Sequence, residues 1–232
     1  MVIHGENEQN NIDLDKLRIF RKQEFNKIYQ SPEGLVKVFD YVPNKDLEIV
    51  LRKLRELNLR HFYEIIELLY KDSTLCGYLM KKYRSYPIDI LEYPSNYVIE
   101  NFNEIFEDLM KLSDEHILAR DLSHENSVFN TYDVTIIDAD DYLLCDYAPY
   151  VENGFGLNCL FKEIFINSII MYHPYLISRL DEIKAILSDI FGESKKPEGV
   201  QRKLSRYKYP IDFINDHLDW KKIILWYNTS CN

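Results

Sequence analysis

The chain has 232 residues, of which 46% are hydrophobic and 14% are aromatic, enough for one large domain or two closely packed parts. Its formal net charge of −10 argues against nucleic-acid binding, and no run approaches the roughly 20 apolar residues of a membrane span. The four cysteines are scattered and lack zinc-ligand spacing. Residues 1–15 lack the cationic and apolar segments of a signal peptide, so we expect a cytoplasmic protein.

The first part of the chain shows strand patterns. Residues 1–12 are polar and aperiodic, which predicts a disordered or weakly attached tail. Apolar clusters around Ile19 and Ile28 precede a Ser-Pro-Glu-Gly turn at residues 31–34 and the apolar run at residues 35–39. Turn residues between β-branched segments predict a hairpin here.

A helix and two more strands follow. Residues 45–59 repeat apolar side chains at helical spacing, which predicts an amphipathic helix packed on the sheet. Residues 63–70 and 75–80 are apolar runs around a Lys-Asp-Ser turn, and they would complete an antiparallel sheet of five strands.

The second half of the chain reads as mainly helical. Apolar residues recur at helical spacing in residues 98–112, 157–171 and 174–191, after a proline-containing connection at 84–100. The end of the chain carries a basic set that is either a solvated face or an anion-binding one: Arg202, Lys203, Arg206, Lys208, Lys221 and Lys222.

The most informative stretch is residues 118–142, LARDLSHENSVFNTYDVTIIDADDY. It places Asp121, Asn126 and Asp138 around a β-branched apolar run at residues 134–137. Carboxylate and amide oxygens are the ligands that Mg²⁺ prefers, and a carboxylate can accept a proton from an attacking hydroxyl. The pattern therefore points to phosphoryl transfer.

The same stretch resembles the protein kinase-like superfamily, in the manner of a minimal or divergent bacterial-type kinase. Arg120-Asp121-Leu122 with Glu125-Asn126 is similar to the catalytic loop H-R-D-L-x-x-x-N, and Ile136-Ile137-Asp138 is similar to the strand that delivers the D-F-G aspartate. The chain departs from that pattern at Ala119, Ser123 and Ala139-Asp140. The IIDADDY turn is closer to the aminoglycoside and choline phosphotransferases, which resemble protein kinases in fold.

The resemblance implies an α+β fold with two lobes, a small antiparallel N-lobe at residues 13–80 and a hinge with a shortened helical C-lobe at residues 81–232. It implies ATP with Mg²⁺ or Mn²⁺ as cofactor. Asp121 would be the catalytic base, and Asn126 and Asp138 would hold the metal. Asp140 is either a further metal ligand or a solvated turn acid.

The resemblance also assigns a nucleotide site. Val36-Lys37 resembles the V-A-I-K strand, so Lys37 would hold the phosphates of ATP and also count among the catalytic residues. Glu48 would pair with Lys37, unless Glu56 does so or both acids are solvated. Met80 would lie at the back of an adenine pocket beside Lys82 in the hinge, although a Met that ends an apolar run is also ordinary core.

Two family features are missing. No glycine loop precedes Lys37, and no Glu follows Ala148-Pro149 to anchor a long activation segment. The acceptor therefore stays open between a protein Ser/Thr hydroxyl and a small-molecule alcohol, and a catalytically inactive pseudokinase that acts as a binding module is the rival interpretation.

Overall fold

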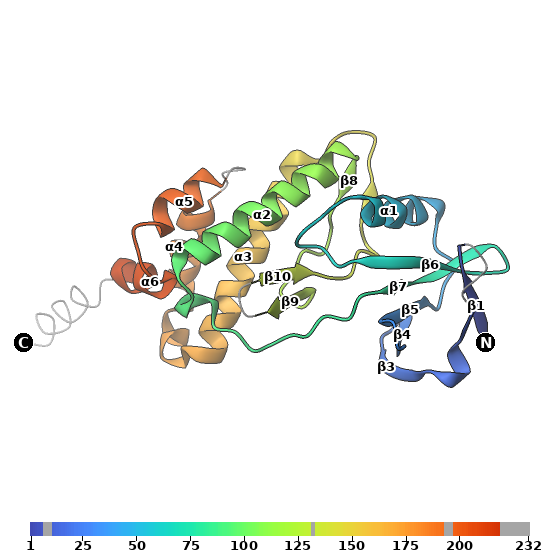
Figure 1. Cartoon of the computed structure of the whole chain (residues 1–232). Coiled ribbons are helices and arrows are strands. Elements are labelled where there is room, and N and C mark those ends of the chain that lie inside the picture. The colour runs from blue at the N-terminus through green and yellow to red at the C-terminus, as the bar shows by residue number, and fades with distance from the viewer. Residues whose placement is uncertain (7–10, 131–132, 193–196, 219–232) are drawn as a thin grey trace, which may run out of the picture.

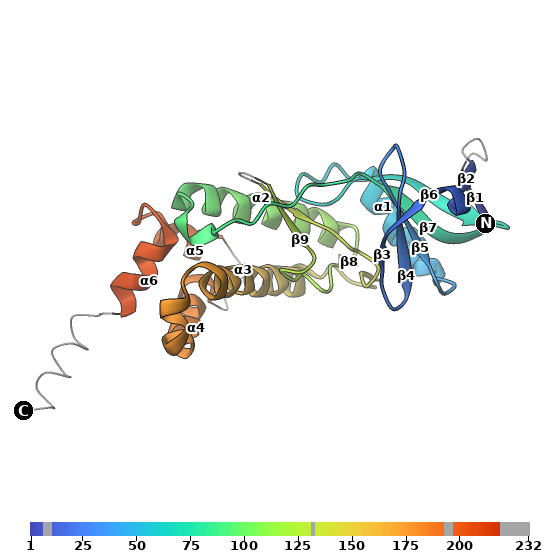
Figure 2. The same ribbon diagram turned by 90° about the horizontal axis from the view of Figure 1, so that it is seen from below.

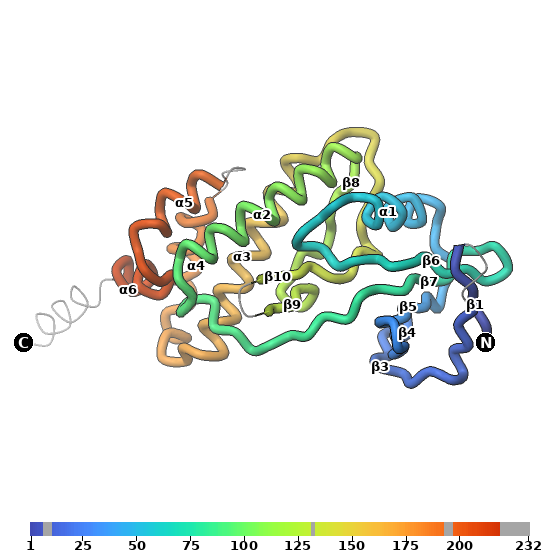
Figure 3. Tube along the Cα trace, viewed as in Figure 1, coloured from blue at the N-terminus to red at the C-terminus, as the bar shows by residue number. Residues whose placement is uncertain are grey.

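The computed structural model describes residues 1–6, 11–130, 133–192 and 197–218. It is a mixed α+β structure with two ends, a sheet region (β1–β7 with α1) and a helical region (α2–α6 with β8–β11) (Figure 1). An extended link after β7 joins the two regions, and it can be followed along the tube in Figure 3.

Seven strands form one antiparallel sheet in the order β2-β1-β6-β7-β5-β4-β3. The five predicted strands are confirmed, and two more extend the sheet beyond β6. The strand bounds are Val2–Gly5 (β1), Asn11–Asp13 (β2), Arg18–Lys22 (β3), Asn26–Gln30 (β4), Leu35–Phe39 (β5), Ile65–Lys71 (β6) and Thr74–Met80 (β7).

The added strands correct the expectation of a loose tail at residues 1–12, as far as these residues are described. Ile3 of β1 is fully buried, and it packs with Leu14, which follows β2. Together they cover Val36, Leu69 and Leu79 on one face of the sheet. Side chains alternate along the central strands, so the sheet has a second apolar face that must be shielded from water. The N-terminal segment is mostly polar, but its few apolar side chains shield this face.

The opposite face of the sheet belongs to the main core. Helix α1 (Lys45–Glu56) covers it and begins where the Asn44 side chain accepts the Leu47 N–H at 2.8 Å, a typical N-cap. The same core continues into the helical region, whose helices are α2 (Ser95–Asp114), α3 (Tyr150–Tyr172), α4 (Leu180–Phe191), α5 (Glu198–Leu204) and α6 (Pro210–Leu218), with short 3-10 turns η1 (Leu14–Lys16), η2 (Ile90–Glu92) and η3 (Pro174–Arg179).

Helices α2 and α3 lie side by side and form the frame of the helical region (Figure 2). Helix α3 is long and apolar enough to cross a membrane by length and composition, but half of its most apolar window is buried inside the fold, as in a core helix. The predicted helices at 98–112 and 157–171 are confirmed, and α2 and α3 extend beyond both ranges. The single helix predicted at 174–191 is divided, because residues 174–179 form the 3-10 turn η3 and α4 begins at Leu180. Lys221 and Lys222 of the expected basic face lie outside the described residues.

Short strands carry the chain past the junction of the two regions. They are β8 (Ile117–Leu118), β9 (Ser127–Asn130), β10 (Asp133–Ile136) and β11 (Leu143–Leu144), which form the antiparallel pairs β9–β10 and β8–β11. The Ile136 N–H donates to His61 O at 2.7 Å, and the Tyr63 N–H donates to Ile136 O at 2.9 Å. The segment entering β6 is thereby fixed to β10, and the loops around β8–β10 are held against the sheet.

Candidate active site

Lys37 is buried because of its place in an alternating strand. In β5, Leu35 and Phe39 point into the main core, so Lys37, two positions from each, faces the same side toward the helical region. Its side chain is only 2% exposed, and its ammonium lies 2.7 Å from Asp138 Oδ1 and 2.6 Å from Asp140 Oδ2. Without those carboxylates a buried ammonium would carry a large desolvation cost.

The neighbouring strand β7 helps to shape the surroundings of Lys37. A Cβ on Gly77 would come within 2.0 Å of the Lys37 carbonyl oxygen, so only glycine allows the two backbones to lie this close. The next residue, Tyr78, is fully buried and donates its hydroxyl to Asp140 Oδ1 at 3.1 Å. Strand β7 therefore supplies both the close approach and a polar partner for the acid.

The two acids stand on a tight turn directly after β10. Asp138 has φ of 69°, a left-handed conformation that costs energy for a residue with a Cβ. Its Oδ1 also accepts the Asp140 N–H at 3.4 Å, which closes the turn. Burial, together with the charge of Asp138, raises the pKa of Asp140 to about 6, and Lys37 acts in the opposite direction.

The loop at Asp121 forms the second part of the site. Asp121 is exposed and has φ of 54°. The Asn126 side-chain amide donates to Asp121 Oδ2 at 2.7 Å and to Asp121 O at 3.1 Å, so Asn126 orients the carboxylate and holds the loop closed. Two left-handed aspartates in one site are the kind of backbone strain that gathers at functional sites.

Buried Asn153 of α3 fixes the approach to this loop. Its side-chain oxygen accepts the Ala119 N–H at 2.8 Å, and its amide donates to Ile117 O at 2.9 Å and to Ser113 Oγ at 2.8 Å. One fully buried side chain therefore ties the strand before Asp121 to two helices. The sequence does not reveal this role, because an Asn in a helix is ordinary until its neighbours are known.

Contacts through the backbone bring the two parts together. The Ile137 N–H donates to Asn126 O at 2.8 Å, so Asn126 is joined to the residue that precedes Asp138. Burial raises the pKa of the Tyr142 hydroxyl, and the charges of Asp138 and Asp121 raise it further. Both carboxylates therefore act on one side chain, as neighbours in a single site do.

Glu48 does not fill its expected role. It pairs with Arg52 at 3.0 Å on the surface of α1 and accepts the Tyr70 hydroxyl at 3.0 Å, while Lys37 pairs with Asp138 and Asp140. The fallback Glu56 is exposed at the end of the same helix. The expected Lys37–Glu48 pair is wrong, because the acids after β10 reach Lys37 from the helical region.

The remaining predicted residues lie at the end of β7. Met80 is buried in the main core, where Gly34 leaves room for its carbonyl oxygen, which a Cβ would approach to 2.2 Å. Lys82 is exposed, and its ammonium lies 5.4 Å from the ring centre of Phe20 on β3. These positions border the start of the link between the regions, and their contact with an adenine stays a prediction.

An open cavity of about 700 Å³ lies beside the Asp121–Asn126 loop. Its walls come from β3, the link between the regions, the segment after Asp121, and α3. The lining residues are Arg21, Ser85, Tyr86, Pro87, Ile88, His124, Glu125, Ser127, Phe129, Ile164, Asn167, Ser168, Met171 and Tyr172. Its volume is in the range of small-molecule sites, and its lining mixes polar and aromatic groups.

A second polar cluster, unnoticed in the sequence, lies around His61. This side chain is fully buried, with Nε2 2.9 Å from Glu104 Oε2 and Nδ1 2.8 Å from Val134 O and 3.0 Å from Asp133 Oδ1. Burial lowers the pKa of His61, but these oxygen partners outweigh it, and the pKa is raised. The spacing of 43 and 73 residues to its partners explains why no sequence motif marks the cluster.

The donor set of the first cluster fits a hard divalent cation. Asp138 and Asp140 supply carboxylate oxygens and Asn126 supplies an amide oxygen, the ligand types that Mg²⁺ and Mn²⁺ take. Asp138 is 27% exposed and so within reach of solvent and ligand. No known family model matches the chain, and no curated protein matches its sequence at a significant level.

Proposed function

We propose that the protein is an ATP-dependent kinase of two-lobed, kinase-like fold that transfers the γ-phosphoryl group to a hydroxyl. The observation that carries the proposal is the 2.7 Å contact between Lys37 on β5 and Asp138 after β10, 101 residues further along the chain. A buried ammonium beside two carboxylates, next to a loop with an exposed and oriented aspartate, matches the roles that phosphoryl transfer needs.

In this mechanism, the acceptor oxygen attacks the γ-phosphorus, the bond from phosphorus to the bridging oxygen of ADP breaks, and the hydroxyl proton passes to Asp121. Asn126 holds the Asp121 carboxylate in position for that proton. Lys37 would neutralise phosphate oxygens of the donor. Bound Mg²⁺, held by Asp138, Asn126 and Asp140, would supply charge neutralisation for the phosphates.

The pairing of Lys37 in the described structure supports this assignment. Among the described residues its ion-pair partners are Asp138 and Asp140, so a phosphate can replace one carboxylate without leaving the charge unpaired. The pair of acids then becomes available to a cation that arrives with the nucleotide. Lys37, Asp138 and Asp140 would change partners together when ATP binds.

The acceptor is a hydroxyl of a protein Ser or Thr or, as second candidate, of a small-molecule alcohol. The cavity of about 700 Å³ favours the second, since residues after Asp121 form one of its walls and its size suits a small ligand. Exposure of Asp121 is compatible with the first.

The test measures phosphoryl transfer from radiolabelled ATP with Mg²⁺ or Mn²⁺, first as ATP hydrolysis and autophosphorylation. Acceptor panels of Ser/Thr peptides and of amino alcohols follow. Asp121→Ala and Asp138→Ala should lose activity, while Asp146→Ala, an exposed acid in the following segment, should keep it.

Equal signal from wild type, Asp121→Ala and Asp138→Ala would contradict the enzymatic proposal. ATP binding that depends on Lys37 and Asp138 without any turnover would instead support the pseudokinase interpretation, in which the chain is a binding module.

A further inference from the structure

A second candidate metal site lies on the helical region, outside the Lys37 cluster. Asp89, Glu92 and His173 each offer a ligand atom, and these atoms all lie within 4.8 Å of one another. Asp89 is the N-cap of η2, Glu92 ends that turn, and His173 follows the last residue of α3. Two segments of chain, η2 and the end of α3, therefore bring one imidazole and two carboxylates together.

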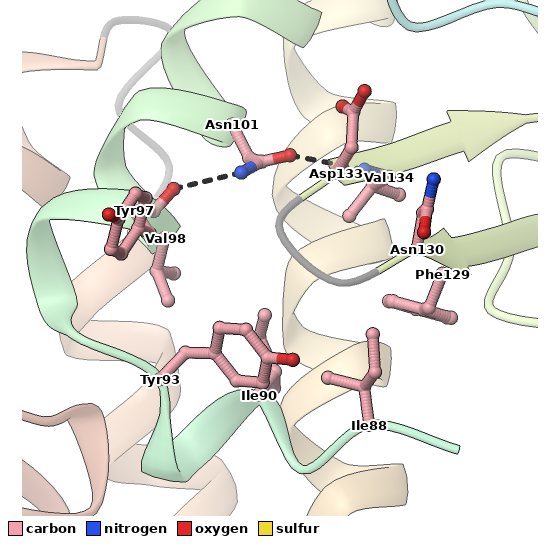
Figure 4. A pocket seen from close by; sticks show the side chains of 10 residues that line it. All are labelled: Ile88, Ile90, Tyr93, Tyr97, Val98, Asn101, Phe129, Asn130, Asp133 and Val134. Carbon is pink, nitrogen blue, oxygen red and sulfur yellow. Dashed lines mark hydrogen bonds between the residues drawn. The ribbon is translucent and has the colours of Figure 1, made fainter. Parts of the chain in front are cut away.

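The geometry of η2 explains why the two acids lie close together. Asp89 caps the 3-10 turn that ends at Glu92, so the two acids stand at the two ends of one short turn. Ile90 and Tyr93 line a small cavity of about 10 Å³ with residues of α2 and β9–β10, and Figure 4 shows both turned toward it. The two acids are absent from the lining of this cavity, and Glu92 is exposed.

Hydrogen bonds hold the turn and the end of α3 in register. The Ile90 N–H donates to Ser168 Oγ of α3 at 3.2 Å, and the His173 N–H donates to Ile169 O at 2.9 Å. The Asp89 carboxylate uses Oδ1 to accept the Leu91 N–H at 3.1 Å. Its second oxygen, Oδ2, lies 2.7 Å from His173 Nε2.

The imidazole supplies the independent observation that points to a ligand. His173 is 5% exposed, and its Nε2 lies 2.7 Å from Asp89 Oδ2 but makes no hydrogen bond within the described residues. Nδ1 lies 3.4 Å from the Tyr175 hydroxyl, a contact that can fix the ring and its tautomer. A buried nitrogen without a hydrogen bond beside two carboxylates is a favourable place for a cation.

We propose that Asp89, Glu92 and His173 form a binding site for a divalent transition-metal ion of the zinc class, which fastens η2 to the end of α3. One imidazole with two carboxylates suits Zn²⁺ and its first-row neighbours, and the exposure of Glu92 leaves a path for entry and for a water ligand.

The site would brace the cavity beside the Asp121–Asn126 loop. Ile88 precedes Asp89, and Tyr172 precedes His173, and both line that cavity. A metal that joins the two ligand segments would therefore fix two of its walls. This role does not depend on phosphoryl transfer.

The test is a Zn²⁺ titration of the full chain after removal of metals with EDTA, read by calorimetry and by the midpoint of thermal unfolding. All proteins carry Asp138→Asn, which weakens the candidate magnesium site and separates the two proposals. We expect one saturable Zn²⁺ per chain and a higher unfolding midpoint. Glu92→Gln should weaken binding by at least about tenfold, since even partners outside the ligand shell are worth 10–100-fold.

The matched control is Glu100→Gln, which removes another exposed acid, on α2, and should bind Zn²⁺ as the parent does. His173→Gln should abolish binding, and if that variant fails to fold, the exposed Glu92 still decides the matter. No saturable Zn²⁺ binding, or equal affinity in the Glu92→Gln and Glu100→Gln proteins, would overturn the proposal.

Discussion

The Lys37 and His61 clusters solve the same problem in different ways. Each buries a basic side chain, 2% and 0% exposed respectively, at the junction of the sheet region and the helical region. Lys37 has two carboxylates and no backbone acceptor among its described ion-pair and hydrogen-bond partners, whereas His61 shares its Nδ1 with the carbonyl of Val134.

The difference separates a candidate ligand-binding site, around Lys37, from a structural cluster, around His61. The Val134 carbonyl is fixed in β10, and the main chain of His61 is also bound, with its N–H donating to Asp108 Oδ2 at 2.8 Å and its carbonyl accepting from Ile136. These main-chain contacts of His61 are part of the scaffold, and its remaining partners are the carboxylates of Glu104 and Asp133. The acids around Lys37 stand on a strained turn, and one of them is partly exposed, so a ligand can replace them.

The largest expected effect comes from Lys37→Met, which keeps the apolar stem and removes the ammonium. Phosphoryl transfer should fall by about 10²–10³-fold, the usual cost of losing one electrostatic partner of the reacting group. The assay is the labelled-ATP measurement, with activity expressed per folded molecule. Lys71→Met, at the exposed end of β6, is the control and should retain activity. Equal activity in the two variants would mean that Lys37 has a structural role only.

His61→Ala should act on stability rather than on chemistry. It leaves the Val134 carbonyl and the Glu104 carboxylate short of a partner, which costs about 1–3 kcal/mol of unfolding free energy. Urea unfolding followed by circular dichroism measures this loss. His4→Ala, a half-buried His on β1, should cost less, and activity per folded molecule should match wild type. A selective loss of activity in His61→Ala would break the distinction between the clusters.

The pH dependence of stability separates the clusters in another way. The fold raises the pKa of Asp140 from 3.8 to about 6, so between these values the native state binds more protons than the unfolded chain, and stability falls as pH rises. Asp140→Asn should abolish that fall, so the stability of the variant relative to wild type should rise from about pH 4 to pH 6 and stay level above. Urea unfolding across pH 4–8 measures it.

His61 supplies the comparison in the same experiment. Its pKa is raised from 6.5, so its stabilising contribution is complete below that value and is lost as pH rises through the folded-state pKa. Asp140→Asn should leave this upper window intact. A variant whose pH profile runs parallel to wild type throughout would show that Asp140 ionises as an ordinary surface acid.

The strands and helices were largely predictable because they depend on local periodicity. The alternation of β5 and the helical repeat of α1 can be read directly from the sequence, and the Ser-Pro-Glu-Gly turn lies where it was predicted. The N-terminal strands were missed because their apolar residues are few. The apolar face that they cover is formed by side chains from several strands, so it is recognisable only in the assembled sheet. In this segment tertiary packing stabilises strands, although the polar composition predicts a disordered tail.

The candidate site was predicted unevenly for a similar reason. Asp121 with Asn126 is a local pair five positions apart, and the structure joins them by a hydrogen bond. The acid that pairs with Lys37 could not be identified from the sequence, because the candidates are distant and pairing depends on which loop reaches the buried ammonium. The hydrogen bonds made by Asn153 and His61 span 34 to 73 residues, beyond any motif.

Glu48→Gln is the smallest and most discriminating change. In the described structure Glu48 joins Arg52 one turn away and Tyr70, so its loss should cost about 0.3–0.5 kcal/mol, as for other helix-surface pairs. Phosphoryl transfer should stay at the wild-type rate, because the charge of Lys37 is balanced by Asp138 and Asp140. Parallel urea unfolding and labelled-ATP assays measure both, with Glu56→Gln on the same helix as control. A drop in rate beyond about tenfold without a matching loss of stability would mean that α1 moves when ATP binds and brings Glu48 to Lys37. The carboxylate pair seen around Lys37 would then describe the nucleotide-free arrangement alone.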